Sequence, residues 1–265
     1  MNDEEIDNAY REGVDKLINK KNFNTARLCF DNVLLHAPLH KNALYHKAIC
    51  YKFQNEHALV VATTKDYLTL HDSRYEIQIL QALGFEGLEQ WGESIQSAKE
   101  ALKLNPESSE ADEVLARVHY LTAGFQTAIR HATSALSRKK TARVYTLRSK
   151  CYEGMNNYPA AIVDADEAIK LNPHYALAYL ARGIALRLQG EYNLALKDYD
   201  KSIAINPGVA EAYYRRGMVW IARGEYARGR KDLGEALSLK PNFEQALAAW
   251  ESIANNQIDD SDSIS

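Results

Sequence analysis

The chain has 265 residues, of which 46 % are hydrophobic and 25 % are charged, and its formal net charge is −3. This balance is typical of a soluble folded protein and gives no reason to expect the broad basic surface that non-specific nucleic-acid binding needs. No stretch approaches the roughly 18–20 apolar residues that span a bilayer, and the acidic N-terminal stretch lacks the apolar core of a secretory signal. We therefore expect a cytoplasmic protein with no nucleic-acid partner and no membrane insertion.

The three cysteines, Cys29, Cys50 and Cys151, are scattered and odd in number. That pattern argues against a disulfide framework. We expect them to be small apolar residues inside helices.

Prolines mark a regular period from the N-terminus onwards. Five of them fall on one phase of a 34-residue grid, once a one-residue deletion is allowed: Pro38, Pro106, Pro173, Pro207 and Pro241. Proline suits a boundary because it cannot continue a helix interior. The grid predicts an N-terminal extension, 1–6, followed by seven repeats: 7–40, 41–74, 75–108, 109–141, 142–175, 176–209 and 210–243.

Each repeat carries two short helical patterns. A small residue recurs in the first helix, as at Gly183 and Gly217, and an aromatic residue opens the second helix, as at Tyr192 and Tyr226. Small residues let helix backbones approach closely, and aromatic rings fill the wedge between neighbouring pairs. Two helices per repeat at this period indicate a solenoid.

The pattern resembles the tetratricopeptide repeat family over residues 7–243. The resemblance is carried by residues that recur at the positions of the family's motif: Tyr145, Tyr179, Tyr213, Tyr152, Leu186, Trp220, Tyr192, Ala195, Tyr199 and Pro207. It implies an all-α, right-handed α-solenoid in which the first helices line the concave side. Repeats two to four depart from the motif, with Asp72 and Lys140 in place of the boundary proline.

The C-terminal region continues the helical pattern. Ala246, Leu247, Trp250 and Ile253 form one apolar stripe, which predicts a capping helix over 244–256 that covers the last repeat. The remaining residues, 257–265, are polar and acidic, and we expect a disordered tail.

No catalytic constellation stands out in the sequence. The glycines are accounted for by repeat geometry, and His36 and His40 are separated by Pro38, which interrupts a common helical face. His119 and His131 lack a cysteine or carboxylate at ligand spacing. We expect no enzyme activity, no cofactor and no metal site.

First-helix residues that do not serve the repeat motif are the candidates for partner contact. Their list is Tyr45, Ile79, Leu83, Leu177, Leu180, Ile184, Arg187, Tyr214, Arg215 and Met218. An exposed apolar strip favours a partner site in the groove, whereas a tight superhelix would pack some of these residues against neighbouring helices. Both interpretations stay open at this stage.

Two known subtypes of the family can be compared with this sequence at their partner-binding positions. At the places where co-chaperone domains hold a C-terminal carboxylate, only Arg215 matches, and the asparagine ladder of long superhelices is absent. Both subtypes are disfavoured. We predict a non-catalytic scaffold or adaptor that binds a peptide-like segment of a protein partner in the concave groove. The alternative is a structural protein that forms homo-oligomers through its ends or groove.

Overall fold

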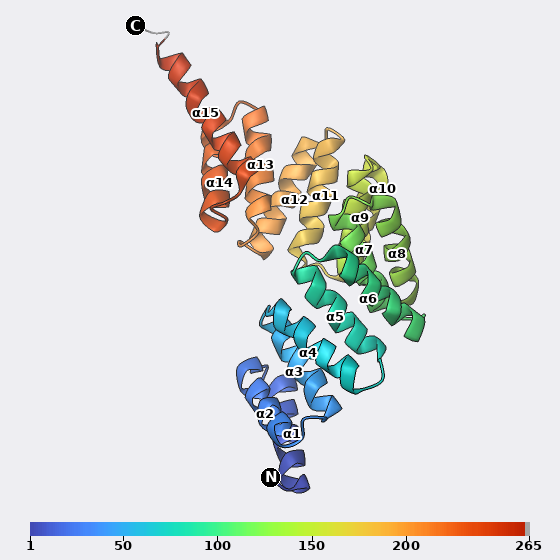
Figure 1. Cartoon of the computed structure of the whole chain (residues 1–265). Helices are drawn as coiled ribbons and strands as arrows, with labels where there is room; N and C mark the ends of the chain where they lie inside the picture. Colours follow the sequence, from blue (N-terminus) through green and yellow to red (C-terminus); the bar gives the residue numbers. More distant parts are fainter. Residues whose placement is uncertain (263–265) are drawn as a thin grey trace. The chain divides into compact units, whose positions relative to one another are not determined.

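The computed structural model describes the backbone of residues 1–262 and the side chains of residues 1–253. These residues form fifteen helices and no strand (Figure 1). The chain divides into two compact parts, which we call the N-terminal lobe, Met1–Lys139, and the C-terminal lobe, Lys140–Ser265. Each lobe is described by itself.

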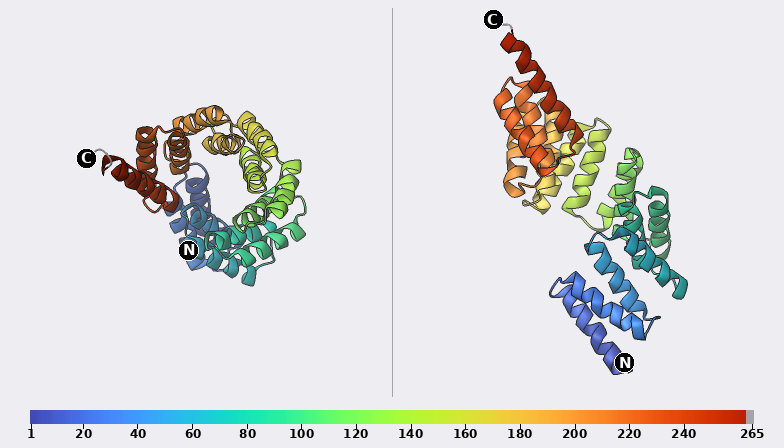
Figure 2. Two further views of the ribbon diagram at one scale, coloured as in Figure 1. Left: turned by 90° about the horizontal axis from the view of Figure 1, so that it is seen from above. Right: turned by 60° about the vertical axis from the view of Figure 1, so that its left-hand side comes forward.

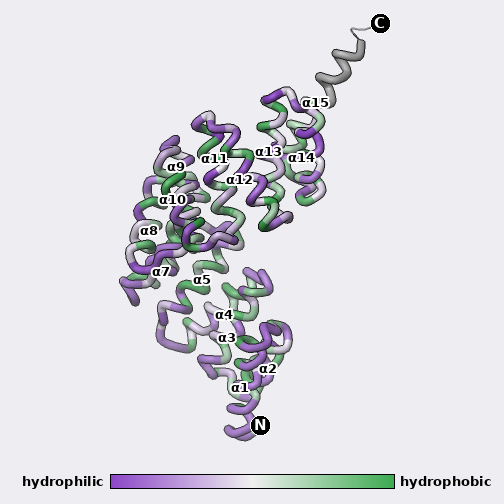
Figure 3. The backbone as a smooth tube through the Cα atoms, turned by 180° about the vertical axis from the view of Figure 1, so that it is seen from behind, coloured by the Kyte–Doolittle hydropathy of each residue, from purple (hydrophilic) through white to green (hydrophobic). Residues whose placement is uncertain are grey.

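The N-terminal lobe consists of four helix pairs. Each first helix packs against the second helix that follows it. The pairs are α1 (Asp3–Ile18) with α2 (Phe23–His36), α3 (Lys41–Phe53) with α4 (His57–Leu70), α5 (Tyr75–Gly87) with α6 (Trp91–Leu104), and α7 (Ser109–Leu121) with α8 (Phe125–Arg138). In Figure 3 the green, hydrophobic residues of α5 contrast with the purple, hydrophilic first turn of α1, which is acidic.

The C-terminal lobe consists of three helix pairs and one longer helix. The pairs are α9 (Ala142–Gly154) with α10 (Tyr158–Leu171), α11 (Ala176–Leu188) with α12 (Tyr192–Ile205), and α13 (Ala210–Ala222) with α14 (Tyr226–Leu239), and they are followed by α15 (Glu244–Asp262). Figure 2 shows the two helices of a pair lying side by side. From the second pair of the chain onwards, each first helix begins at the first residue of a repeat on the proline grid.

The turn inside every pair contains one residue with a positive φ angle. The seven residues are Lys21, Asn55, Glu89, Ala123, Asn156, Gly190 and Gly224. They are 34 residues apart, except that Ala123 and Asn156 are 33 apart, which is where the sequence places its one-residue deletion. Left-handed backbone is costly for any residue with a Cβ atom, and only the last two repeats meet it with glycine.

Close helix contact explains the small residues of the motif. A Cβ atom added to Gly183 would lie 2.7 Å from a ring carbon of Tyr199. Tyr199 itself is fully buried, and so is Ala195. The ring therefore packs directly on the backbone of α11, and this contact sets the spacing between α11 and α12.

Ion pairs join successive repeats of the C-terminal lobe. Arg182 donates from Nε and Nη2 to the buried Asp198 carboxylate at 2.8 and 2.7 Å, and from Nη1 to Asp166 of the preceding repeat at 2.7 Å. Arg216 makes the same contacts with Asp232 and Asp200. These carboxylates raise the pKa of both arginines, with the hydrogen bond inside the repeat as the largest cause. Each arginine therefore links two repeats by charge-assisted hydrogen bonds.

Two predictions about the chain ends are wrong. Residues 3–6 belong to α1 and are not a separate extension, because Asn2 caps the helix and Glu5 completes a capping box. α15 continues to Asp262, beyond the predicted end at residue 256, and no glycine or proline interrupts it. The predicted disordered tail therefore begins inside a helix, and its last part, 263–265, lies outside the described residues.

Candidate functional site

The first helices form the inner side of each lobe. In the C-terminal lobe α9 and α11 contact each other directly, and no comparable contact joins α10 and α12 in the described part. In the N-terminal lobe α5 contacts both α3 and α7, again without comparable contacts between the second helices of residues 1–139. A stack whose first helices converge while its second helices diverge is curved, with the first helices on the inner face.

Three of the residues predicted to contact a partner lie on the inner face of the N-terminal lobe. Tyr45 on α3 and both Ile79 and Leu83 on α5 are partly exposed. Tyr45 also packs against two small core clusters, and the Arg74 guanidinium lies over its ring, 5.7 Å from the centroid. Ile79 is not among the residues of the clusters that Tyr45 and Leu83 join, so its partly exposed side chain is available to a partner.

The prediction of an exposed apolar strip on α11 is wrong. Leu180 and Ile184 are 1 % and 3 % exposed, and they form a core cluster with Tyr199 and Leu196. Leu177 is partly buried and packs against the same cluster. These side chains are covered because the other members of the cluster come from α12 and α13, and α12 packs against both α11 and α13.

The remaining predicted residues of the C-terminal lobe come together on its inner face. Tyr214 and Arg215 line a cavity of about 320 Å³ with Glu211, Lys240 and Phe243. Arg215 donates to Glu211 at 3.0 Å, and its guanidinium lies 5.4 Å from the centre of the Tyr214 ring. Arg215 and Lys240 are therefore the two cations that line the cavity, and Glu211 provides a carboxylate beside them.

Met218 follows on the same helix. It is partly exposed and takes no part in the core clusters of the described residues. It lies one helical turn after Tyr214 and Arg215 on α13, so it adds an apolar, adaptable side chain to that part of the helix.

The side chains of Arg187 and Tyr199 lie next to each other and carry buried polar atoms. Arg187 Nε and Tyr199 Oη are buried and have no hydrogen-bond partner among the described protein groups. Burial raises the pKa of Tyr199, and the charges of Arg187 and Arg215 oppose that rise in part. Burial also raises the pKa of Glu153 on α9, again opposed by Arg215. These four side chains thus share one electrostatic environment on the inner face.

Sequence reasoning missed the arginine–aspartate pairs and the environment around Tyr199. The pairs had a signal, because Arg148, Arg182 and Arg216 recur at the 34-residue period, as do their aspartates. Tyr199 was assigned to the repeat motif, which explains its ring. Its hydroxyl had no sequence signal, because the neighbours of a buried hydroxyl depend on how three helices pack.

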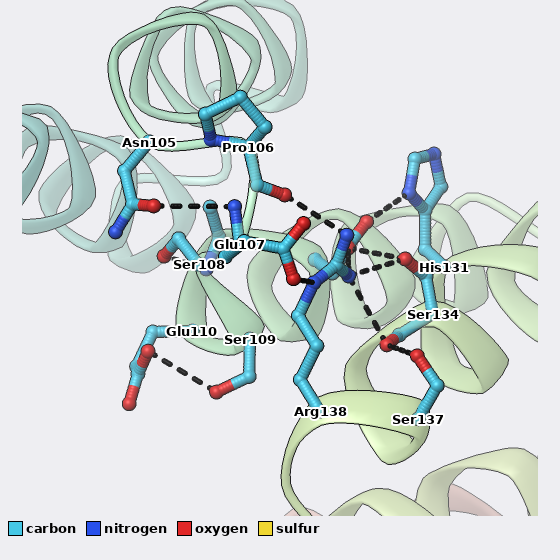
Figure 4. Close-up of polar contacts among 12 residues, drawn as sticks. Asn105, Pro106, Glu107, Ser108, Ser109, Glu110, His131, Ser134, Ser137 and Arg138 are labelled. Carbon is cyan, nitrogen blue, oxygen red and sulfur yellow. Dashed lines mark hydrogen bonds and ion pairs between the residues drawn. The ribbon is translucent and has the colours of Figure 1, made fainter.

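In the N-terminal lobe, a buried polar network links α7 and α8. Asp112 is 3 % exposed and accepts from His131 Nδ1 at 2.7 Å, from Ser134 Oγ at 2.6 Å and from Arg138 at 2.7 Å. Figure 4 shows Arg138 reaching also to Glu107 and the Pro106 carbonyl. Serine and histidine both bind the carboxylate, which is not the relay of a nucleophilic triad. The network ties α8 to Asp112 on α7 and to the turn before α7.

The described residues provide no other obvious chemistry. Within that part, no group of three or more His, Cys, Asp or Glu side chains is placed to hold a metal ion. Among the helices of residues 1–262, none has both the length and the low polarity needed to cross a bilayer.

Known proteins show what the chain resembles. Three stretches match models of the tetratricopeptide repeat: 142–175, 176–209 and 210–243. A comparison with curated proteins found no match.

Solved structures resemble it in fold. A tetratricopeptide repeat protein from Parabacteroides merdae has a TM-score of 0.74 at 18 % identity, covering 93 % of this chain and 99 % of its own. The Cut9-Hcn1 hetero-tetramer of APC/C gives 0.72 at 13 %, covering 89 % and 46 %. YrrB, described as having an unusual peptide-binding site, gives 0.52 at 17 %, covering 71 % and 97 %. At these identities the similarity concerns the fold alone.

Proposed function

Because the chain belongs to the tetratricopeptide-repeat family, we propose that it is a non-catalytic scaffold or adaptor whose inner face binds a peptide-like segment of a protein partner. The family generally mediates protein–protein interaction. The observation that carries the proposal is the inner face of the C-terminal lobe, where Tyr214 and Arg215 line an open cavity and Met218 on the same helix is partly exposed. The cytoplasmic location expected from the sequence stays a prediction.

The magnitudes fit a segment of moderate affinity. Burying Met218 and one other exposed apolar side chain contributes about 3–6 kcal/mol, and association costs about 4–15 kcal/mol. Hydrogen bonds to charged groups add about 1.5–3 kcal/mol each. Apolar contact alone therefore does not hold the segment, and the charged groups of the inner face decide affinity and register.

The test is partner recovery with inner-face variants. Leu180 and Ile184 are unsuitable because glutamate there would disrupt the core. Met218→Glu and Ile79→Glu place the change on side chains outside the core clusters of the described residues. Val163→Glu is the matched control, since Val163 is 61 % exposed on the second helix α10.

We expect Met218→Glu to lose partners that the unchanged protein and the Val163→Glu control recover in affinity purification with mass spectrometry. Circular dichroism establishes that each variant remains folded. Full recovery by a folded double variant, Met218→Glu with Ile79→Glu, would show that the inner face is not the binding site.

Self-association is the second candidate, and one surface favours it. Leu28 and Leu35 lie seven positions apart on one face of α2 and are 56 % and 75 % exposed. Light scattering at increasing concentration tests whether this surface forms homo-oligomers. A mass that stays monomeric, or an oligomer unaffected by Leu28→Glu with Leu35→Glu, rules out a role for these leucines.

A further inference from the structure

Helix α15 begins where the first helix of an eighth repeat would begin. Its first residue, Glu244, comes 34 residues after Ala210, the first residue of α13. The first helices α9, α11 and α13 have 13 residues each, and a second helix packs beside each of them. α15 instead runs on for 19 residues as one helix (Figure 1). Within the described residues, the place beside α15 that a second helix would take is therefore not filled.

The apolar stripe of α15 is covered only in part. Ala246 and Ile253 are 0 % and 5 % exposed and belong to the core cluster that closes the last repeat. Leu247 is 39 % exposed, and Trp250, which packs against that cluster, remains partly exposed. In the three preceding first helices, the place of Leu247 holds a buried or partly buried tyrosine: Tyr145, Tyr179 or Tyr213. Part of the stripe is thus left uncovered after the last repeat is closed.

Trp250 occupies the place of the arginine that joins repeats. Arg216, 34 residues earlier, bonds to Asp200 on the second helix before it and to Asp232 on the second helix after it. On α14 the place of Asp200 is taken by Gly234, and a Cβ atom added there would lie 3.4 Å from a ring carbon of Trp250. The Trp250 ring therefore lies against the helix before it, as Arg216 does. By the same geometry it faces the place where the next second helix would pack.

A cavity of about 530 Å³ lies at that place. It is lined by Trp250 on α15 and by residues of α14 that include Ala227, Gly234, Arg230, Lys231 and Glu235. Small residues on α14 let a helix backbone approach closely, and the aromatic ring offers an apolar anchor. None of these residues lines the cavity at Tyr214 and Arg215. The size and lining therefore suit a helix that lies along α14 and against Trp250.

The charges around this cavity favour an acidic helix. The Arg230 guanidinium lies 5.0 Å from the centre of the Trp250 ring, and Lys231 is exposed beside it on α14. Among the described residues of the lining, Glu235 is the one carboxylate, so the two cations outnumber it. Complementary charge at the edge of an interface guides a partner into register and disfavours partners of the wrong sign.

We propose that the cavity between α14 and α15 binds an acidic, amphipathic helix of a partner protein. The apolar face of that helix packs on Trp250 and the small residues of α14, and its carboxylates reach Arg230 and Lys231. The helix continues the stacking by which α14 itself packs on α13. This surface goes beyond the proposed inner-face site and does not depend on it, so the two can fail separately.

A phage library of 14-residue peptides is the probe, because the second helices of the C-terminal lobe have 14 residues each. An alanine-rich frame favours helix formation, and the positions on one face are randomised. Peptides selected on the full chain are synthesised with acetylated and amidated ends, which removes the terminal charges. A fluorescent label then allows dissociation constants to be measured by anisotropy.

We expect the selected peptides to carry acidic side chains and to gain helical circular dichroism on binding. Trp250→Ala should weaken binding about 10- to 100-fold, as loss of a central aromatic anchor does. Ala227→Glu should weaken it about 10-fold, because the new side chain fills the cavity and repels carboxylates, and Lys231→Glu about 3- to 10-fold. The matched controls are Val163→Glu on α10 and Met218→Glu on the inner face, and both should leave binding unchanged.

The variant Ala227→Glu keeps the test decisive if Trp250→Ala loosens α15, because Ala227 is exposed and lies outside the core cluster of the last repeat. Failure to select any peptide would overturn the inference. Selected peptides that are basic or uncharged, or that respond to Met218→Glu but to neither cavity variant, would also overturn it. Light scattering gives the last check: association of the chain with itself that Trp250→Ala abolishes would show that a second copy, rather than a partner helix, occupies the cavity.

Discussion

Arg182→Gln removes the guanidinium that links two repeats of the C-terminal lobe. The substitution leaves the Asp198 carboxylate, whose side chain is 7 % exposed, without its two arginine hydrogen bonds. It also removes the bond to Asp166, whose side chain is 43 % exposed. The buried carboxylate dominates the cost, because water can replace the arginine at Asp166 but not at Asp198.

The size of the effect follows from this burial. Removing one partner of a buried pair costs about 3–5 kcal/mol, and the 27 % exposure of the arginine side chain reduces this to about 2–4 kcal/mol. The N-terminal lobe supplies a neutral version of the pair, in which Ser97 Oγ lies 3.2 Å from Gln81 Oε1. The double change Arg182→Gln with Asp198→Ser copies it and should come within about 1 kcal/mol of the unchanged protein.

Urea unfolding followed by circular dichroism at neutral pH compares the three proteins. Because repeat arrays can unfold in stages, hydrogen exchange of α11 and α12 provides a local measure of the same difference. The reasoning predicts a large loss for the single variant and recovery in the double variant. It is refuted if the double variant is as unstable as the single one, or if the single variant loses nothing.

Three further predictions concern other parts of the chain. Ala123→Gly should raise the free energy of unfolding by about 0.5–1 kcal/mol, because Ala123 has a φ of 58°; an unchanged urea midpoint would contradict this. Burial raises the pKa of the Cys50 and Cys151 thiols to about 12, so iodoacetamide at pH 8 should label Cys29 first by mass spectrometry, and equal labelling would count against the packing. Burial opposes ionisation of Asp112, but hydrogen bonds from its partners hold its pKa below the usual value. The stability it contributes is therefore present above about pH 4 and lost as pH falls through the lower folded pKa, so the stability gap to Asp112→Asn, measured by thermal unfolding, should shrink below pH 4 and should not shrink between pH 8 and 5.

The repeat pattern predicted the all-α solenoid because its signals are local. Prolines and the small and aromatic residues fix where helices begin and which faces touch, and their spacing survives the departures at Asp72 and Lys140. The chain ends were harder to predict. Asn2 and Glu5 form a capping box that the proline grid does not contain.

The candidate site was predicted only in part, for a physical reason. A position on a first helix can face the groove or the next helix, and the distance between helices decides which. On α11 Leu180 and Ile184 are buried in a cluster with residues of α12 and α13, whereas Met218 on α13 stays partly exposed. The sequence pattern gives the same periodicity in both cases, so exposure had to come from the packed structure.

Site-specific photo-crosslinking tests the central claim most directly, which is that the inner face of the C-terminal lobe binds a partner segment. A benzophenone amino acid is placed at Met218 on the inner face or, as a control, at Val163, which is 61 % exposed on α10. The account predicts that a partner peptide crosslinks to the Met218 position. Crosslinks from the Val163 position alone would contradict it.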